Sequence, residues 1–187
     1  FQKGQILYQS QMTREIAHKA DQLIVVEGYM DVISLAEVGM SNAVAPLGTA
    51  LTEGQIRELW KFSTEPIICF DGDSAGMRAA VRASDRLLPI LEPGFSARFA
   101  SLPPGEDPDD IVRRGGANKF RELLEASTGL SDFFWETEKI NGSLDTPEKQ
   151  AAFFKRIRKR VVEIKNQTVR EAYKDSIEAK IYNFRAS

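Results

Sequence analysis

The chain has 187 residues, of which 42% are hydrophobic and 28% are charged, and this balance excludes a disordered or fibrous protein. Its 25 Lys and Arg residues are matched by 27 Asp and Glu residues, so nucleic-acid binding through overall charge is excluded and only local basic patches remain. No apolar stretch approaches the roughly 18 residues of a membrane span, and the first residues do not read as a secretory signal.

Apolar runs of strand length alternate with longer amphipathic stretches in the first half of the chain, a pattern typical of parallel strands joined by crossover helices. The predicted strands are Leu23–Val26, Ala43–Ala45, Pro66–Phe70 and Ala97–Leu102. The predicted helices between them are Asp31–Val38, Thr52–Phe62 and Ser74–Leu91. Thr52 and Gln55 predict a capping box for the second helix, and Pro93-Gly94 predicts the turn after the third.

After Pro103-Pro104 the strand pattern stops and only helices are predicted. They are Pro108–Arg114, Ala117–Ala126, Leu130–Ile140, Pro147–Asn166 and Val169–Phe184. Thr146, Pro147 and Glu148 form a strong helix start, with a capping hydroxyl, a proline and an early negative charge. The sequence therefore predicts an α/β domain with a mainly parallel sheet and helices on both faces (residues 23–128), preceded by a short segment (1–22) and followed by a helical bundle (129–187).

Two features indicate the cellular compartment and the extent of the chain. Cys69 is the only cysteine and lies in an apolar run, which favours a reducing cytoplasm and predicts a small buried side chain. The chain starts at Phe1 rather than Met and runs directly into structured-looking sequence, so we interpret it as part of a longer protein.

Three acidic clusters follow predicted strands, at the edge where an open α/β sheet usually binds its ligand. They are Glu27–Asp31, Asp71–Asp73 and Glu106–Asp110. In extended chain, Asp71 and Asp73 point the same way, while Gly72 keeps the wall between them low. Crowded carboxylates repel one another unless a cation neutralises them, and an all-oxygen ligand set suits Mg²⁺ or Mn²⁺. Taken alone, however, an Asp-Gly-Asp after a strand is more often a turn with a helix cap.

The three strings Val25–Val32, Phe70–Gly76 and Leu102–Asp109 resemble the bacterial replicative DNA primases of the DnaG type, in the same order and at similar spacing. The first two contain the Glu-Gly and Asp-x-Asp motifs of the Toprim domain, which topoisomerases and recombination mediators share. Phe1–Gly4 and the helical tail, with Thr146-Pro147, also resemble the primase polymerase region. The resemblance thus covers nearly the whole chain and implies a Toprim fold followed by a helical subdomain.

The resemblance implies a nucleotidyltransferase that builds short RNA primers. It assigns catalysis to Glu27, Asp71 and Asp73. It assigns Mg²⁺ or Mn²⁺ to the same three residues together with Asp31, Asp107 and Asp109, and nucleotide binding to Lys3, Gly48 and Thr49. Glu27 would either ligate metal or accept the hydroxyl proton, and the sequence leaves both open. The zinc of the full-length family has no Cys/His ligand set in this chain.

The implied partners are a single-stranded DNA template, ribonucleoside triphosphates and the RNA primer, at the replication fork in the bacterial cytoplasm and without a membrane. The resemblance places contacts with the replicative helicase and single-strand-binding protein outside this chain. The missing first half of the polymerase region leaves open whether the chain is active alone. Alternatives are a Toprim nuclease or topoisomerase, a haloacid-dehalogenase-type phosphatase and a non-catalytic binding module.

Two further patterns have a structural and a functional interpretation. The basic run Lys155–Arg160 can contact nucleic acid, but an apolar stripe on the same helix favours a solvated face on a packed helix. Phe133–Trp135 can stack on bases, but core packing in the helical bundle is favoured.

Overall fold

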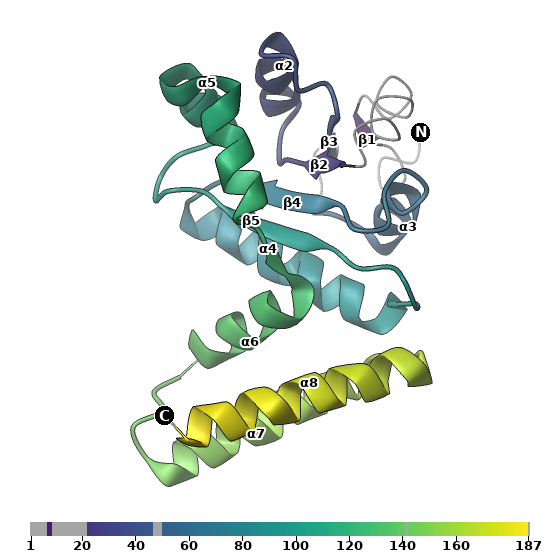
Figure 1. Ribbon diagram of the computed structural model, residues 1–187, viewed down its shortest axis with the longest axis vertical. Coiled ribbons are helices and arrows are strands. Elements are labelled where there is room, and N and C mark those ends of the chain that lie inside the picture. The colour runs from purple at the N-terminus through teal and green to yellow at the C-terminus, as the bar shows by residue number, and fades with distance from the viewer. Residues whose placement is uncertain (1–6, 9–21, 47–49, 141, 187) are drawn as a thin grey trace.

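The computed structural model describes residues 7–8, 22–46, 50–140 and 142–186. Their strands form one sheet in the order β1-β3-β2-β4-β5-β6 (Figure 1). The strands are β1 Leu7–Tyr8, β2 Ile24–Val25, β3 Ala43–Pro46, β4 Ile67–Phe70, β5 Arg98–Ser101 and β6 Thr128–Gly129. The four predicted strands, β2 to β5, are parallel neighbours, which confirms the mainly parallel sheet. The antiparallel edge strands β1 and β6 were not predicted, because two residues show no alternation.

Helices cover both faces of the sheet, as the sequence predicted (Figure 1). One face carries α2 (Tyr29–Glu37) and α5 (Pro108–Glu125), and the other carries α3 (Glu53–Leu59) and α4 (Ser74–Leu87). Successive strand residues point to opposite faces, so β2 buries Ile24 against the first pair and Val25 against the second. Burial on both sides explains why these strands read as continuous apolar runs, and why Cys69 in β4 is fully buried.

Most predicted helices are found with ends shifted by a few residues, and two of them end clearly earlier than predicted. The α4 helix ends at Leu87 and continues as a short 3₁₀ turn, η2 (Leu88–Ile90), because Pro89 has no N–H to extend the α-helical hydrogen bonds. The predicted helix to Asn166 also ends early, at Val161, and Asn166 instead caps the next helix by accepting a hydrogen bond from Val169 N–H. The predicted break in α5 is found at Gly116, whose φ is 65°.

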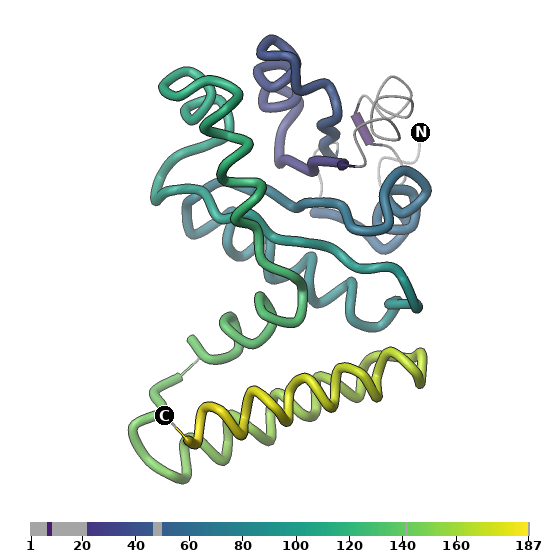
Figure 2. The backbone as a smooth tube through the Cα atoms, in the orientation of Figure 1, coloured from purple at the N-terminus to yellow at the C-terminus, as the bar shows by residue number. Residues whose placement is uncertain are grey.

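The C-terminal helices α6 (Leu130–Ile140), α7 (Pro147–Val161) and α8 (Gln167–Ala186) lie below the sheet, with α7 and α8 side by side (Figure 2). Phe133 stacks on Phe99 of β5, with ring centroids 3.9 Å apart, and Trp135 packs against Phe153 of α7. Phe133–Trp135 therefore belongs to the hydrophobic core, as the sequence analysis favoured over base stacking. No helix in the described ranges is long and apolar enough to cross a membrane.

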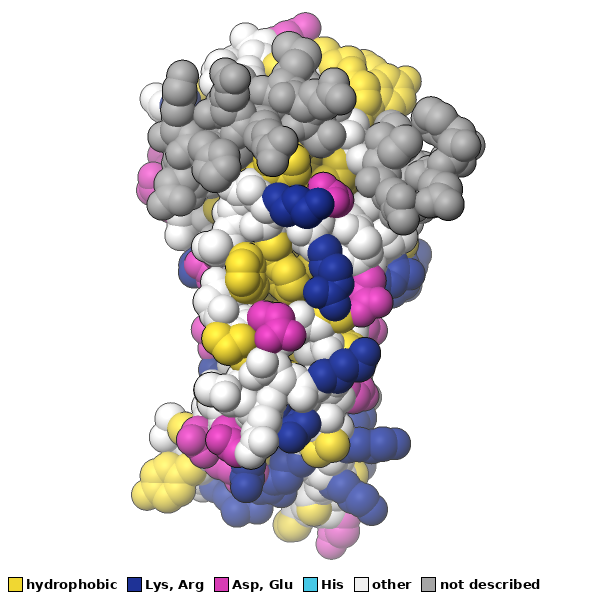
Figure 3. Space-filling view, turned by 90° about the vertical axis from the view of Figure 1, so that its right-hand side faces the viewer, with side chains coloured by type: hydrophobic (Ala, Val, Ile, Leu, Met, Phe, Trp, Pro, Cys, Tyr) yellow, Lys and Arg dark blue, Asp and Glu magenta, His cyan; other side chains and the backbone are white. Residues whose placement is uncertain are grey.

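The basic run on α7 belongs to a packed helix, with Phe153, Ile157 and Val161 buried. The expected solvated face is found at Arg158, which pairs with Glu178 at the surface, but Arg156 and Arg160 turn inward and pair with the buried Glu138. On the face shown in Figure 3, Lys and Arg side chains are interspersed with Asp and Glu along the molecule. This mixed pattern agrees with the nearly balanced formal charge of −2.

Candidate active site

The carboxyl ends of the neighbouring parallel strands β2 and β4 bring Glu27 and Asp71 together. The backbone N–H of Asp71 donates a 3.1 Å hydrogen bond to Glu27 Oε1, so the glutamate spans the gap between the two strands. Asp71 Oδ1 is buried and has no hydrogen-bond partner among the described residues. A buried carboxylate oxygen without a donor is costly, and it marks a position that suits a cation or a proton.

The pKa values of two aspartates at this end of the sheet, Asp71 and Asp31, are raised by burial and by neighbouring negative charges. The pKa of Asp71 is raised to about 7, most of all by burial and in addition by the negative charges of Glu27 and Asp31. The pKa of Asp31 is raised to about 6, most of all by burial. The charges of Asp107, Glu27 and Asp109 act in the same direction, whereas a 3.0 Å hydrogen bond from Gly28 N–H opposes the rise. The three acidic clusters therefore share one electrostatic environment.

Two of the aspartates also cap helices. Asp73 Oδ1 accepts hydrogen bonds from the N–H groups of Ala75 at 2.8 Å and Gly76 at 2.7 Å, at the start of α4. Asp107 Oδ1 accepts one from Asp110 N–H at 2.8 Å, at the start of α5. Asp73 therefore does act as a helix cap, which was the structural alternative to its predicted role as a metal ligand. Capping engages one of the two carboxylate oxygens, so it is compatible with a second ligand.

Two glycines let these segments approach. A Cβ on Gly72 would lie 2.0 Å from the carbonyl oxygen of Pro103, and Gly72 N–H donates to the Glu106 carbonyl at 2.8 Å. The sequence analysis expected Gly72 only to leave space between two aspartates. In the structure its missing side chain lets the loop after β5 pack against the end of β4. A Cβ on Gly76 would lie 2.1 Å from the Asp71 carbonyl oxygen, so only glycine lets α4 start this close to the strand end.

The remaining predicted residues fall into two groups. Asp109 forms a 2.9 Å ion pair with Arg113 and lies at the outside of the acidic edge. Lys3, Gly48 and Thr49 lie outside the described residues. Among the side chains that the structure describes, no three acidic, cysteine or histidine groups are already close enough to ligate one ion together. The carboxylates therefore border the site without forming a ready-made cage.

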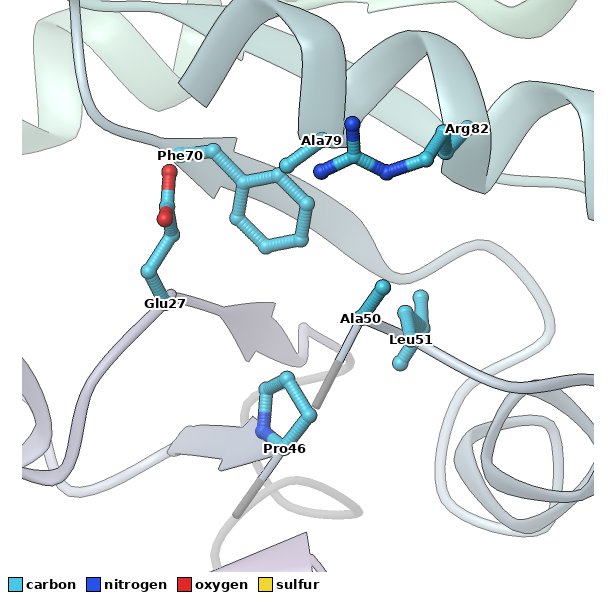
Figure 4. A pocket seen from close by; sticks show the side chains of 7 residues that line it. All are labelled: Glu27, Pro46, Ala50, Leu51, Phe70, Ala79 and Arg82. Carbon is cyan, nitrogen blue, oxygen red and sulfur yellow. The ribbon is translucent and has the colours of Figure 1, made fainter. Parts of the chain in front are cut away.

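A pocket of about 300 Å³ opens beside Glu27 (Figure 4). Its lining comes from the ends of β2, β3 and β4, from the segment before α3 and from α4, and consists of Glu27, Pro46, Ala50, Leu51, Phe70, Ala79 and Arg82. Arg82 was not among the residues that we predicted for the site. The available signal was helical spacing, since Arg82 follows Ala79 by three residues and shares its side of α4.

Two family descriptions match the chain. Residues 24–112 match the family described as Toprim-like, and residues 131–181 match the DnaB-helicase binding domain of primase. The second match places a segment of that description inside the chain, whereas the sequence interpretation put the helicase contact outside it. The acidic edge and the pocket lie in the first matched region.

Curated relatives are similar over much of the chain. A DNA primase of Rickettsia bellii is 37% identical over 92% of this chain and 29% of its own length. A DNA primase of Pseudomonas aeruginosa is 43% identical over 81% of this chain and 23% of its own length. The chain thus spans less than a third of the length of these relatives.

Solved structures agree over nearly the whole fold. The crystal structure of a DNA primase domain from Pseudomonas aeruginosa is 37% identical, with a TM-score of 0.88, over 97% of this chain and 56% of that one. The E. coli primase catalytic core is 35% identical, with a TM-score of 0.86, over 97% and 58%. A DnaG primase catalytic domain bound to single-stranded DNA gives the same identity and TM-score over 96% and 58%. Sequence motifs, sheet order and these likenesses together show that the chain belongs to the DnaG-type DNA primase family, with a Toprim domain followed by the helical region of the catalytic core.

Proposed function

We propose that the chain forms the metal-binding part of a template-directed nucleotidyltransferase that synthesises RNA primers on single-stranded DNA in the bacterial cytoplasm. The observation that carries the proposal is the Glu27–Asp71 pair, with its unpartnered buried oxygen, at the ligand-binding edge of a Toprim sheet. The relative that was solved with single-stranded DNA supports the template. Primer synthesis and its substrates are proposed for the whole protein and not for this chain alone. The related primases are three to four times longer than this chain.

The donor set fits a divalent cation of the Mg²⁺ or Mn²⁺ type. All donors are carboxylate oxygens, one is buried without a hydrogen-bond partner, and the residues repel one another when all are charged. The residues that would hold metal are Asp71, Asp73, Glu27 and Asp31, with Asp107 and Asp109 at the periphery. The bound cation supplies charge neutralisation for the triphosphate and for the leaving pyrophosphate.

The chain's own groups set up this chemistry. Burial and repulsion keep Asp71 and Asp31 partly protonated near neutral pH, so cation binding would displace protons from them. The Asp71 N–H group orients Glu27, which can then ligate metal through its second oxygen or accept the proton of an attacking hydroxyl. The helix starts at Asp73 and Asp107 direct their positive dipole ends at the edge where phosphate charge collects.

The helical region supports a second part of the proposal. Because residues 131–181 match the DnaB-helicase binding domain of primase, we propose that α6, α7 and part of α8 contribute to contact with the replicative helicase. Contact with single-strand-binding protein is left to parts of the longer protein.

Primer synthesis tests the proposal directly. The chain is supplemented with the part of the Pseudomonas aeruginosa catalytic core that it does not match, and is incubated with single-stranded DNA, ribonucleotides and Mg²⁺. We expect short RNA products that disappear in Asp71→Asn/Asp73→Asn. Metal-dependent nicking of DNA without RNA synthesis would overturn the proposal in favour of a Toprim nuclease.

A further inference from the structure

The pocket beside Glu27 is lined by one positively charged side chain, Arg82, which has no role in the acidic metal site proposed above. Arg82 extends from α4 past Ala79 toward Phe70, with Glu27 on the far side of Phe70 (Figure 4). The opposite wall of the pocket carries the Glu27 carboxylate, and small or apolar side chains form the rest of the lining. The pocket therefore presents a positive group and a negative group on two sides of a space of about 300 Å³.

The neighbouring arginine on the same side of α4 makes a structural contact that Arg82 does not make with any described residue. Arg86 donates a hydrogen bond to the Leu51 carbonyl and thereby ties Leu51 to α4. Arg82 lies one turn earlier, is exposed, and forms no ion pair with any residue that the structure describes. A guanidinium that faces a pocket without an acidic partner is available to an anionic ligand.

We propose that Arg82 binds phosphate oxygens of the nucleotide substrate; this inference rests on the proposed function. The planar guanidinium fork matches a phosphate group, and Ala79 and Ala50 leave room for it. Arg82 lies eight residues beyond the start of α4, about 12 Å along its axis, and long helical side chains lean back toward the helix start. A triphosphate with one end at the carboxylates can therefore extend along α4 to Arg82.

Two sources supply this phosphate chemistry. The triphosphate of the incoming ribonucleotide is favoured, because Glu27 lines the same pocket and belongs to the acidic edge whose carboxylates would hold the cation that accompanies a triphosphate. The phosphodiester backbone of the growing primer is the other source. Kinetics separate the two, since one alters the KM for nucleotide and the other the KM for primed template.

The test compares Arg82→Ala and Arg82→Lys with Arg78→Ala, which removes an exposed arginine one turn earlier on α4 that does not line the pocket. Each variant is made in the supplemented system described above. Nucleotide concentration is varied during synthesis without a primer, and primer-template concentration is varied during elongation. Thermal melting of each variant checks that the fold is retained.

We expect Arg82→Ala to raise the KM for ribonucleotide by about tenfold or more with kcat changed little, as expected for loss of a charge-assisted phosphate contact. Arg82→Lys should recover part of the loss, and Arg78→Ala should match the wild type. A rise only in the KM for primed template supports phosphate binding with the primer as its source. Unchanged KM values in both assays, or an equal effect of Arg78→Ala, would overturn the inference alone. A wild-type protein that makes no RNA would overturn the proposed function, and this inference with it.

Discussion

Glu27 has one structural contact that a substitution can preserve. Its Oε1 atom accepts the Asp71 N–H, and it forms no ion pair with a Lys or Arg in the described ranges. Glutamine at this position retains an acceptor oxygen and nearly the same size, but removes the charge. The contact between the strand ends and the charge of the site can therefore be separated.

For Glu27→Gln we expect primer synthesis to fall by about a hundredfold or more, since a catalytic group or metal ligand loses its charge. The melting temperature should hold or rise slightly, because one member of a repulsive cluster is neutralised. Primer yield at saturating Mg²⁺ and a thermal melt of the same preparation provide the measurement. A stable variant with near-normal yield would remove Glu27 from the mechanism.

The raised pKa of Asp71 predicts how stability depends on pH without metal. Its folded pKa, about 7, lies above its ordinary value of 3.8, so the folded state binds more protons between these values. Its stabilising contribution is complete below about pH 4 and is lost as the pH rises through 7. Asp31, with a pKa of about 6, acts in the same direction.

We therefore expect the free energy of unfolding in EDTA to fall from pH 5 to pH 8, and Asp71→Asn to reduce that fall. The gain at pH 8 should be about 1–2 kcal/mol, because solvent screening reduces the effect at a half-buried carboxyl. Urea unfolding of both proteins at each pH measures it. Parallel stability curves would show that Asp71 keeps an ordinary pKa in the fold.

At the scale of elements, a buried polar group joins the Toprim sheet to the helical region. Glu138 on α6 is 5% exposed and pairs with Arg156 and Arg160 on α7, at 2.9 and 2.6 Å. Arg160 also reaches Asp85 on α4 at 2.5 Å and lies over the Phe134 ring. One guanidinium thus connects α4, α6 and α7, and fixes how the helical region sits on the Toprim domain.

Arg160→Leu should destabilise the protein by about 3 kcal/mol, because it leaves the buried Glu138 with one cation fewer. Arg158→Leu is the matched control, since Arg158 lies in the same basic run and pairs with Glu178 at the exposed surface. Its cost should stay within about 1 kcal/mol. Urea unfolding of both variants measures the difference, and equal costs would argue against a special role for the buried group.

At the scale of the whole molecule, the sequence predicted the features that depend on neighbouring residues, but not those that depend on contacts between distant residues. The capping box of Thr52 and Gln55 and the break at Gly116 follow from residues near in sequence, and both were predicted. The sheet order and the edge strands β1 and β6 depend on pairings between distant residues. The buried Glu138 was not predicted either, because its pairing with Arg156 and Arg160 on α7 is set by tertiary packing.

The same distinction applies to the acidic edge. The sequence identified Glu27, Asp71 and Asp73 because each follows an apolar strand, and parallel strands end at one edge. It did not identify Arg82, because the pocket is formed by elements from three parts of the chain. The sequence also did not show why residue 72 is glycine, because the close contact that requires it is with Pro103 in the loop after β5.

The concentration of like charges at one edge should make the stability of the whole fold respond to divalent cations. Binding to the folded state alone stabilises it in proportion to the logarithm of ligand concentration above Kd. We expect Mg²⁺ or Mn²⁺ to raise the melting temperature at pH 8 by a few degrees, a modest gain because substrate phosphates normally complete such sites. Melts with increasing metal concentration measure the effect.

The metal-dependent gain should disappear in Asp71→Asn/Asp73→Asn. Asparagine is as good a helix cap as aspartate, so Asp73→Asn keeps the start of α4 and removes only charge. Asp132→Asn/Asp145→Asn removes the same net charge from two exposed ion pairs away from the edge and should retain the gain. If all three proteins gain equally, the ion acts at another site or through general screening of the acidic surface. A gain lost only in the first variant would locate the cation at the edge where β2 and β4 end, before any substrate is bound.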